Sequence, residues 1–115
     1  GEDYRVIVLG SEALAAMRRR AGPGEFRSNL HRAGMAERVE DAEVLARLEK
    51  LALAATAALD LDFAGVDLML DEQGAPVILE VNPVPSLEGV ERVSGIDIAG
   101  KIVDFALSRR VQASA

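Results

Sequence analysis

Three oxygen-bearing side chains, Asp67, Glu80 and Asn82, lie in two aliphatic segments that flank Gln73-Gly74. Segments of this kind on either side of a glycine-containing turn predict a β-hairpin. Pairing the segments across the turn places Asp67 opposite Glu80, with Asn82 two residues further along on the same side. Carboxylate and amide oxygens are hard ligands, which suit Mg²⁺ or Mn²⁺. The hairpin therefore predicts a metal site formed by these three residues.

The register of this hairpin is fixed by its opposite, apolar face. The pairing joins aliphatic residues directly across the two strands, and such pairs stabilise one register over its alternatives. The expected pairs are Val66 with Val81, Leu68 with Leu79, and Leu70 with Val77. Two opposed carboxylates repel each other unless a proton or a cation lies between them. The alternative is a solvated strand face on which acidic residues only favour solubility.

Composition limits the classes of function. The chain has 115 residues, no cysteine and a net charge of −6, so we expect a single domain without disulfides or thiol chemistry, in a reducing cytoplasm. The negative charge argues against direct nucleic-acid binding, which depends on neutralising phosphates. No apolar run approaches the roughly 20 residues of a membrane helix, so no membrane partner is expected.

A second predicted hairpin occupies the N-terminal 20 residues and carries most of the cationic candidates. Pairing its strands across Gly10-Ser11 places Asp3 opposite Arg18 and Arg5 opposite Ala16, on one face. The open end of this hairpin would therefore carry an acid–base pair, Asp3 with Arg18, and a second arginine, Arg5. We expect the neighbouring Arg19 to be part of a solvated strand end.

The remaining segments complete an α+β domain. Residues 21–34 predict a long loop whose glycines, asparagine and arginines could line an anion or a nucleotide. Residues 41–59 have an apolar stripe at helical spacing, with Asp41 as N-cap. Residues 83–89 predict a stiff loop, and 97–110 a last helix with Val103 and Leu107 facing inward. We expect an antiparallel sheet with the helices packed on one face.

Six ordered motifs resemble RimK-type ATP-grasp ligases and together cover nearly the whole chain. They are Asp3-x-Arg5, Phe26-Arg27-Ser28-Asn29-Leu30-His31-Arg32, Ala64-Gly65-Val66-Asp67, Glu80-Val81-Asn82-Pro83, Leu87-Glu88-Gly89-Val90-Glu91 and Gly95-Ile96-Asp97-Ile98-Ala99-Gly100. A Glu-x-Asn with an upstream Asp is shared by ATP-grasp enzymes generally, whereas the Phe-Arg-Ser-Asn-Leu-His segment points to the RimK branch.

The resemblance implies a role for each candidate residue. Asp67, Glu80 and Asn82 would hold two divalent cations, Mg²⁺ or Mn²⁺, that bridge the β- and γ-phosphates of ATP. Arg27, Ser28 and Asn29, in the second of these motifs, would line the nucleotide site. Arg5 and Arg18 would face the transferred phosphate or the carboxylate substrate.

The resemblance also implies the reaction. ATP-grasp ligases phosphorylate a carboxylate, and an amine then attacks the acylphosphate to give an amide. RimK-like enzymes join glutamate or a related amino acid to a protein or peptide acceptor. Residues 1–115 would be the C-terminal ATP-grasp subdomain, without the upstream half and front domain, and inactive alone. In Pro85-Ser86 the chain departs from a frequent Pro-Gly, which puts details of the substrate loop in doubt.

Two other functions stay open at this point. A close Asp–Glu pair would also suit a retaining glycosidase, but such sites need stacking aromatics, and the chain has one Tyr, three Phe and no Trp. The domain could also be a non-catalytic nucleotide-binding, metal-binding or assembly module. Acceptor identity and homo-oligomer formation are not readable from the sequence.

Overall fold

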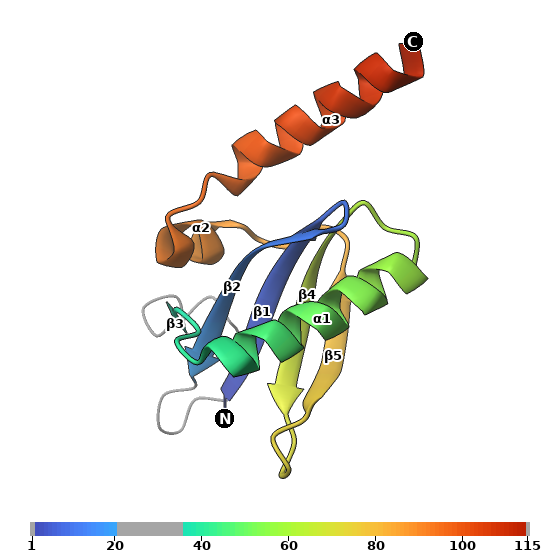
Figure 1. Ribbon diagram of the computed structural model, residues 1–115. Helices are drawn as coiled ribbons and strands as arrows, with labels where there is room; N and C mark the ends of the chain where they lie inside the picture. Colours follow the sequence, from blue (N-terminus) through green and yellow to red (C-terminus); the bar gives the residue numbers. More distant parts are fainter. Residues whose placement is uncertain (1, 21–35, 115) are drawn as a thin grey trace.

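The computed structural model describes residues 2–20 and 36–114, which form one antiparallel sheet and three helices. The strands follow the spatial order β3-β2-β1-β4-β5. Their bounds are β1 (Glu2–Leu9), β2 (Glu12–Arg20), β3 (Ala36–Glu37), β4 (Phe63–Leu70) and β5 (Pro76–Asn82). The helices are α1 (Ala42–Ala58), α2 (Glu88–Ser94) and α3 (Ile98–Ser114). The predicted α+β class and antiparallel sheet are confirmed (Figure 1).

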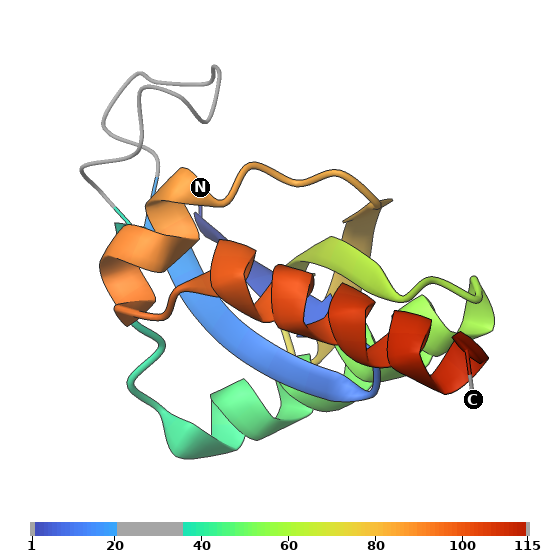
Figure 2. The same ribbon diagram turned by 90° about the horizontal axis from the view of Figure 1, so that it is seen from above.

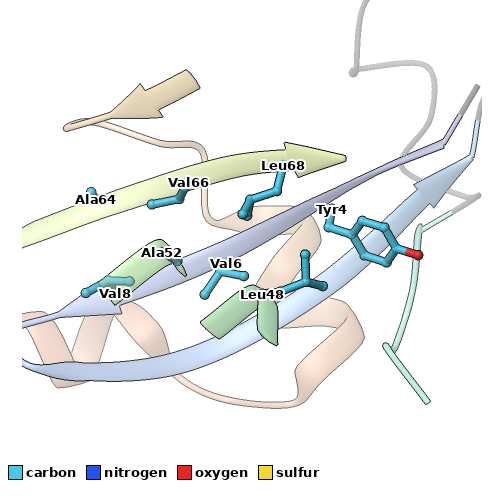
Figure 3. Packing of buried hydrophobic residues seen from close by; sticks show 8 residues of the cluster. All are labelled: Tyr4, Val6, Val8, Leu48, Ala52, Ala64, Val66 and Leu68. Atoms are coloured by element: carbon cyan, nitrogen blue, oxygen red, sulfur yellow. The ribbon is translucent and has the colours of Figure 1, made fainter. Parts of the chain in front are cut away.

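The main core lies between the sheet and α1, which crosses one face of the sheet (Figure 1). Alternate residues of β1 and β4 point toward α1, as period-2 strands require. Leu48 and Ala52 of α1 meet them and are fully buried (Figure 3). The sheet residues in this cluster are Tyr4, Val6, Val8, Ala64, Val66 and Leu68. A 17-residue amphipathic helix is thereby stabilised by tertiary packing.

A smaller core occupies the opposite face, where α2 and the first residues of α3 pack (Figure 2). Val90 of α2 and Ile98 of α3 are fully buried there against Ile7 and Met17 of the sheet. The helices were predicted to pack on one face of the sheet. Helix α1 does so, whereas α2 and the start of α3 cover the opposite face. The predicted site residues Asp67, Glu80 and Asn82 lie on this second face, on the β4–β5 pair.

A β-bulge changes the register of the first hairpin. Ile7 pairs with Ala15 but Val8 pairs with Ala13, so Leu14 is an extra residue on β2. The predicted pairing of Asp3 with Arg18 is therefore wrong: Asp3 lies opposite Arg19 and Arg5 opposite Met17.

A second bulge divides the β4–β5 hairpin into two parts. On the side away from the turn the predicted register is confirmed, with Asp67 opposite Glu80. On the turn side the two predicted pairs are wrong, because an extra residue, Leu79, shifts β5 by one position. The observed pairs there are Leu68 with Ile78, and Leu70 with Pro76.

The helices predicted from the sequence form close to their expected positions, but some residues predicted to be buried are exposed. Asp41 caps α1, and its side chain accepts hydrogen bonds from the amides of Glu43 and Val44. Helix α2 begins at Glu88, so the predicted loop over 83–89 extends two residues too far, and no element had been predicted over 90–94. Val103 and Leu107 of α3 are 56% and 52% exposed, so their predicted burial is wrong. None of the helices in the described part of the chain has the length and apolar character that a membrane crossing requires.

Candidate active site

Asp67, Glu80 and Asn82 lie on the sheet face opposite α1, as the sequence predicted. Asp67 pairs directly with Glu80, and Asn82 pairs with Gly65, two residues before Asp67 on the same face. The three side chains differ in burial: Asp67 is buried, Asn82 is half-buried and Glu80 is exposed. The three side chains therefore extend from the protein interior to the solvent on the β4–β5 strand pair.

Two arginines from neighbouring strands contact the buried carboxylate of Asp67. Arg5 lies opposite Asp67 across β1 and β4 and binds it with two hydrogen bonds, Nε to Oδ1 at 2.7 Å and Nη2 to Oδ2 at 3.0 Å. Arg19 reaches over β1 from β2, and its Nη2 lies 3.4 Å from Oδ1 of Asp67. The two guanidiniums relieve the repulsion between Asp67 and Glu80, which the sequence had assigned to a cation.

Asp3 completes a network of alternating charge. Its carboxylate accepts two hydrogen bonds from Arg19, from Nε at 2.8 Å and from Nη2 at 3.0 Å. The order Asp3–Arg19–Asp67–Arg5 joins two anions and two cations, so the network has no net charge. Paired and fully hydrogen-bonded charges can be buried at acceptable energy, whereas a lone charge cannot. The hydrogen bond to Asp67 raises the pKa of Arg5 above its usual value, so Arg5 is always cationic.

Arg19 is the functional candidate that the sequence reasoning missed. Its side chain is 4% exposed, so the expected solvated strand end is wrong. Strand alternation assigns Arg18, not Arg19, to the face of Arg5, and only the bulge reverses that assignment. No residue type around Leu14 marks the bulge in the sequence. The approach of Arg19 to Asp3 and Asp67 therefore had no local signal.

Arg18 lies on the α1 face of the sheet, away from Asp67. It pairs with Glu37 of β3, and that hydrogen bond lowers the pKa of the exposed Glu37 carboxyl. The Nε of Arg18 is the one buried side-chain polar atom without a hydrogen-bond partner in the described ranges. The structure thus separates the two predicted catalytic arginines, Arg5 and Arg18, on opposite sides of the sheet. Arg27, Ser28 and Asn29, the predicted nucleotide contacts, lie outside the described residues.

The loop after β5 is held against β4 by a close backbone approach. A Cβ atom placed on Gly65 would lie 2.5 Å from Cβ of Pro85, so only glycine permits this contact. The amide of Val84 donates to Oδ1 of Asn82 at 2.9 Å, which fixes the amide side chain at the start of the loop.

The chemistry of the three side chains fits a hard divalent cation. They offer two carboxylates and one amide oxygen, and each carboxylate has about four lone-pair positions. Across residues 2–20 and 36–114, no three His, Cys, Asp or Glu side chains gather at a point suited to a metal.

Comparison with known proteins identifies the family. A probable alpha-L-glutamate ligase of Serratia proteamaculans strain 568 is 46% identical over 109 residues, covering 95% of this chain and 35% of that protein. A ribosomal protein bS6--L-glutamate ligase of Escherichia fergusonii is 48% identical over 103 residues, covering 90% of this chain and 33% of that protein. The chain thus spans about a third of the length of these curated relatives.

Solved structures agree with this assignment at the level of the fold. The D-alanine--D-alanine ligase of Bacillus anthracis complexed with ATP superposes with a TM-score of 0.74 and 26% identity, over 98% of this chain and 40% of that one. The ATP-grasp ligase PsnB, complexed with a precursor variant, Mg and ADP, gives a TM-score of 0.69 at 23% identity, over 96% and 32% of the two chains. The model of the RimK-like ATP-grasp domain matches residues 1–106. The chain belongs to the RimK-like ATP-grasp family.

Proposed function

We propose that this chain is the C-terminal, cation-binding part of an ATP-dependent carboxylate–amine ligase. The observation that carries the proposal is the juxtaposition of two opposed carboxylates, an adjacent amide and two buried arginines on one sheet face. Phosphoryl transfer depends on positioning and on charge neutralisation more than on a covalent nucleophile. This face supplies both kinds of charge, and the chain has no cysteine to act as a thiol nucleophile.

Each group has a role that its position supports. Asp67, Glu80 and Asn82 would hold Mg²⁺ or Mn²⁺, two ions in the complete site, which neutralise phosphate charge when bound. Arg5 and Arg19 present guanidinium groups beside the same carboxylate, so they are suited to contact the transferred phosphoryl group or the substrate carboxylate. Arg19 takes the role that the sequence gave to Arg18. Asn82 is held by the backbone of Val84 and therefore keeps its orientation.

The reaction and its partners follow from the relatives. The named activities of the Serratia and Escherichia proteins are glutamate ligations, and the second acts on a ribosomal protein. We therefore propose a glutamate-like amino acid as substrate and a protein or peptide as acceptor, joined through an acylphosphate. Arg27, Ser28 and Asn29 remain the proposed nucleotide contacts. A cytoplasmic location suits an enzyme with such substrates, and homo-oligomer formation stays open.

The competing function is a non-catalytic nucleotide-binding, metal-binding or assembly module. A scaffold would retain its function when Glu80 is replaced by Gln, because that side chain is exposed and the substitution keeps its size. A ligase extended to the length of its relatives would lose activity by orders of magnitude. Release of phosphate by the extended protein, with and without Glu80→Gln, separates the two functions.

A titration of the 115-residue chain with Mn²⁺–ADP, followed by NMR, tests the site directly. Paramagnetic broadening should centre on the amides of Asp67, Glu80 and Asn82 and should saturate. Glu80→Gln should weaken the binding about tenfold or more, since a ligand is lost while the fold is kept. Glu72→Gln changes the same charge in the exposed turn of the same hairpin and should leave the affinity unchanged. Broadening that is absent, or that is indifferent to Glu80→Gln, would contradict the proposed site.

A further inference from the structure

We infer that Asp3 is a positioning residue, which holds Arg19 at the site independently of Asp67. The inference rests on the proposed function, because it concerns the arginines beside the proposed cation site. Asp3 itself points its two oxygens at Arg19 and makes no direct hydrogen bond to Arg5 or Asp67 among the described contacts. Apart from the charge of Asp3, which also acts on Arg5, any effect of Asp3 on an anion at this face therefore acts through Arg19.

The two arginines depend on Asp67 to different extents. The two hydrogen bonds that the Arg5 side chain donates within the described ranges both end on Asp67, one on each oxygen. Arg19 instead makes its two hydrogen bonds to Asp3, and its approach to Asp67 is a longer contact of 3.4 Å. When a cation or another ligand engages the oxygens of Asp67, Arg5 loses its partners and is free to turn. Arg19 keeps its partners and stays in place.

The geometry of the Asp3–Arg19 pair explains how Asp3 fixes the position of the Arg19 guanidinium. Asp3 and Arg19 are directly opposed across β1 and β2, so the pair spans one strand spacing without bending either side chain. The Arg19 side chain is 4% exposed and that of Asp3 is 21% exposed. A bidentate carboxylate–guanidinium pair fixes the plane of the arginine as well as its position. The Nη2 of Arg19 is thereby directed over β1 toward the site.

The charge of Asp3 and its proposed positioning role predict opposite effects of Asp3→Asn on the affinity for a polyphosphate. Asp3 is an anion close to a face that is proposed to bind phosphate, so its charge alone opposes anion binding. If Asp3 acted only as a nearby charge, Asp3→Asn would strengthen the binding of a polyphosphate. If Asp3 positions Arg19, the same variant weakens that binding, because the guanidinium loses its fixed orientation.

The experiment uses the 115-residue chain with inorganic tripolyphosphate in the presence of EDTA, so that no divalent cation contributes. NMR of the arginine Nε–Hε groups reports Arg5 and Arg19 individually. We expect tripolyphosphate to shift both resonances, and Asp3→Asn to weaken the affinity about three- to tenfold, which lies in the lower part of the range for coupled neighbours. The Arg19 resonance should also lose its distinct shift in this variant. Glu2→Gln removes the same charge one residue away and should leave the affinity unchanged or slightly increased.

A double-mutant cycle isolates the path through Arg19. Arg19→Lys keeps the charge but cannot form the bidentate pair, so in that background Asp3→Asn should produce no further loss. Asp3→Glu keeps the charge and lengthens the side chain, and it should cause an intermediate loss; it also serves if Asp3→Asn does not fold. Stronger binding by Asp3→Asn, or an equal loss in the Arg19→Lys background, would overturn the inference. Absence of any arginine shift in the unmodified chain would also overturn the inference, whereas the Mn²⁺–ADP titration tests the proposed function separately.

Discussion

Replacement of Asp67 by Asn should destabilise the fold strongly, whatever the site binds. The side chains of Asp67, Arg5 and Arg19 are 8%, 9% and 4% exposed, so the three charges are almost removed from water. Asparagine has nearly the same shape and can still accept one hydrogen bond, but it leaves the Arg5 guanidinium buried without a counter-charge. Breaking a buried pair in this way costs about 3–5 kcal/mol.

The lower end of that range is expected here, because Arg19 keeps Asp3 as its partner. We therefore expect a loss of about 3 kcal/mol, which corresponds to a fall in melting temperature of about 12 °C for a domain near 100 residues. Urea unfolding followed by circular dichroism at 222 nm measures the free energy. Glu80→Gln is the matched control, since it removes a carboxylate from the opposed, exposed position and should change stability by less than about 0.5 kcal/mol.

A second substitution tests the cause. Adding Arg5→Met to Asp67→Asn removes the stranded charge and fills similar space, so the double variant should be more stable than Asp67→Asn alone. A loss below about 1 kcal/mol for Asp67→Asn would refute the buried network, because an exposed pair is worth no more than that. If the double variant lost as much unfolding free energy as the two single variants together, the explanation by an unpaired buried charge would be refuted.

Three further predictions concern the elements that position the site. Gly65→Ala should destabilise the chain by about 1–3 kcal/mol through its clash with Pro85, and it should shift the amide signals of Asn82 in an NMR spectrum. Asp41→Ala should cost about 1 kcal/mol in urea unfolding, because the start of α1 loses its cap. Burial, and then the hydrogen bond to Glu2, raise the pKa of Tyr4, the only tyrosine of the chain, so its absorbance titration should lie above pH 10. Since the folded-state pKa is the higher one, the stability that Tyr4 contributes is complete below about pH 10 and is lost as the pH rises through the folded-state pKa; Tyr4→Phe should abolish that loss.

The sequence predicted the carboxylates and Arg5 on one sheet face and exchanged the positions of Arg18 and Arg19. Asp67 and Glu80 were placed correctly because aliphatic pairs such as Val66 with Val81 fix the register on the site side of the bulge. Arg19 was missed because its hairpin was aligned from the turn alone, and the bulge at Leu14 lies between the turn and the arginine. A turn determines register only as far as the first irregularity of the ladder.

The remaining misassignments share a different cause. The short helix α2 has little sequence signal of its own, and it forms because Val90 is buried against the sheet. On α3, apolar periodicity indicates a helix but does not say how much of its apolar surface the rest of the fold covers. Ile98 is buried while Leu107 stays exposed, although both lie on the predicted apolar face. Packing partners that are distant in sequence decide both outcomes.

The bulge at Leu79 has a practical consequence for protein engineering. It separates the β4–β5 hairpin into a site half and a turn half whose registers are already offset by one residue. The turn, closed by a hydrogen bond from the amide of Asp71 to the carbonyl of Ala75, lies beyond that offset and is solvent-exposed. A short tag or reporter peptide inserted between Glu72 and Gln73 would therefore leave the Asp67–Glu80 alignment in place. The hairpin tip offers an attachment point close to the face that we propose to bind cations.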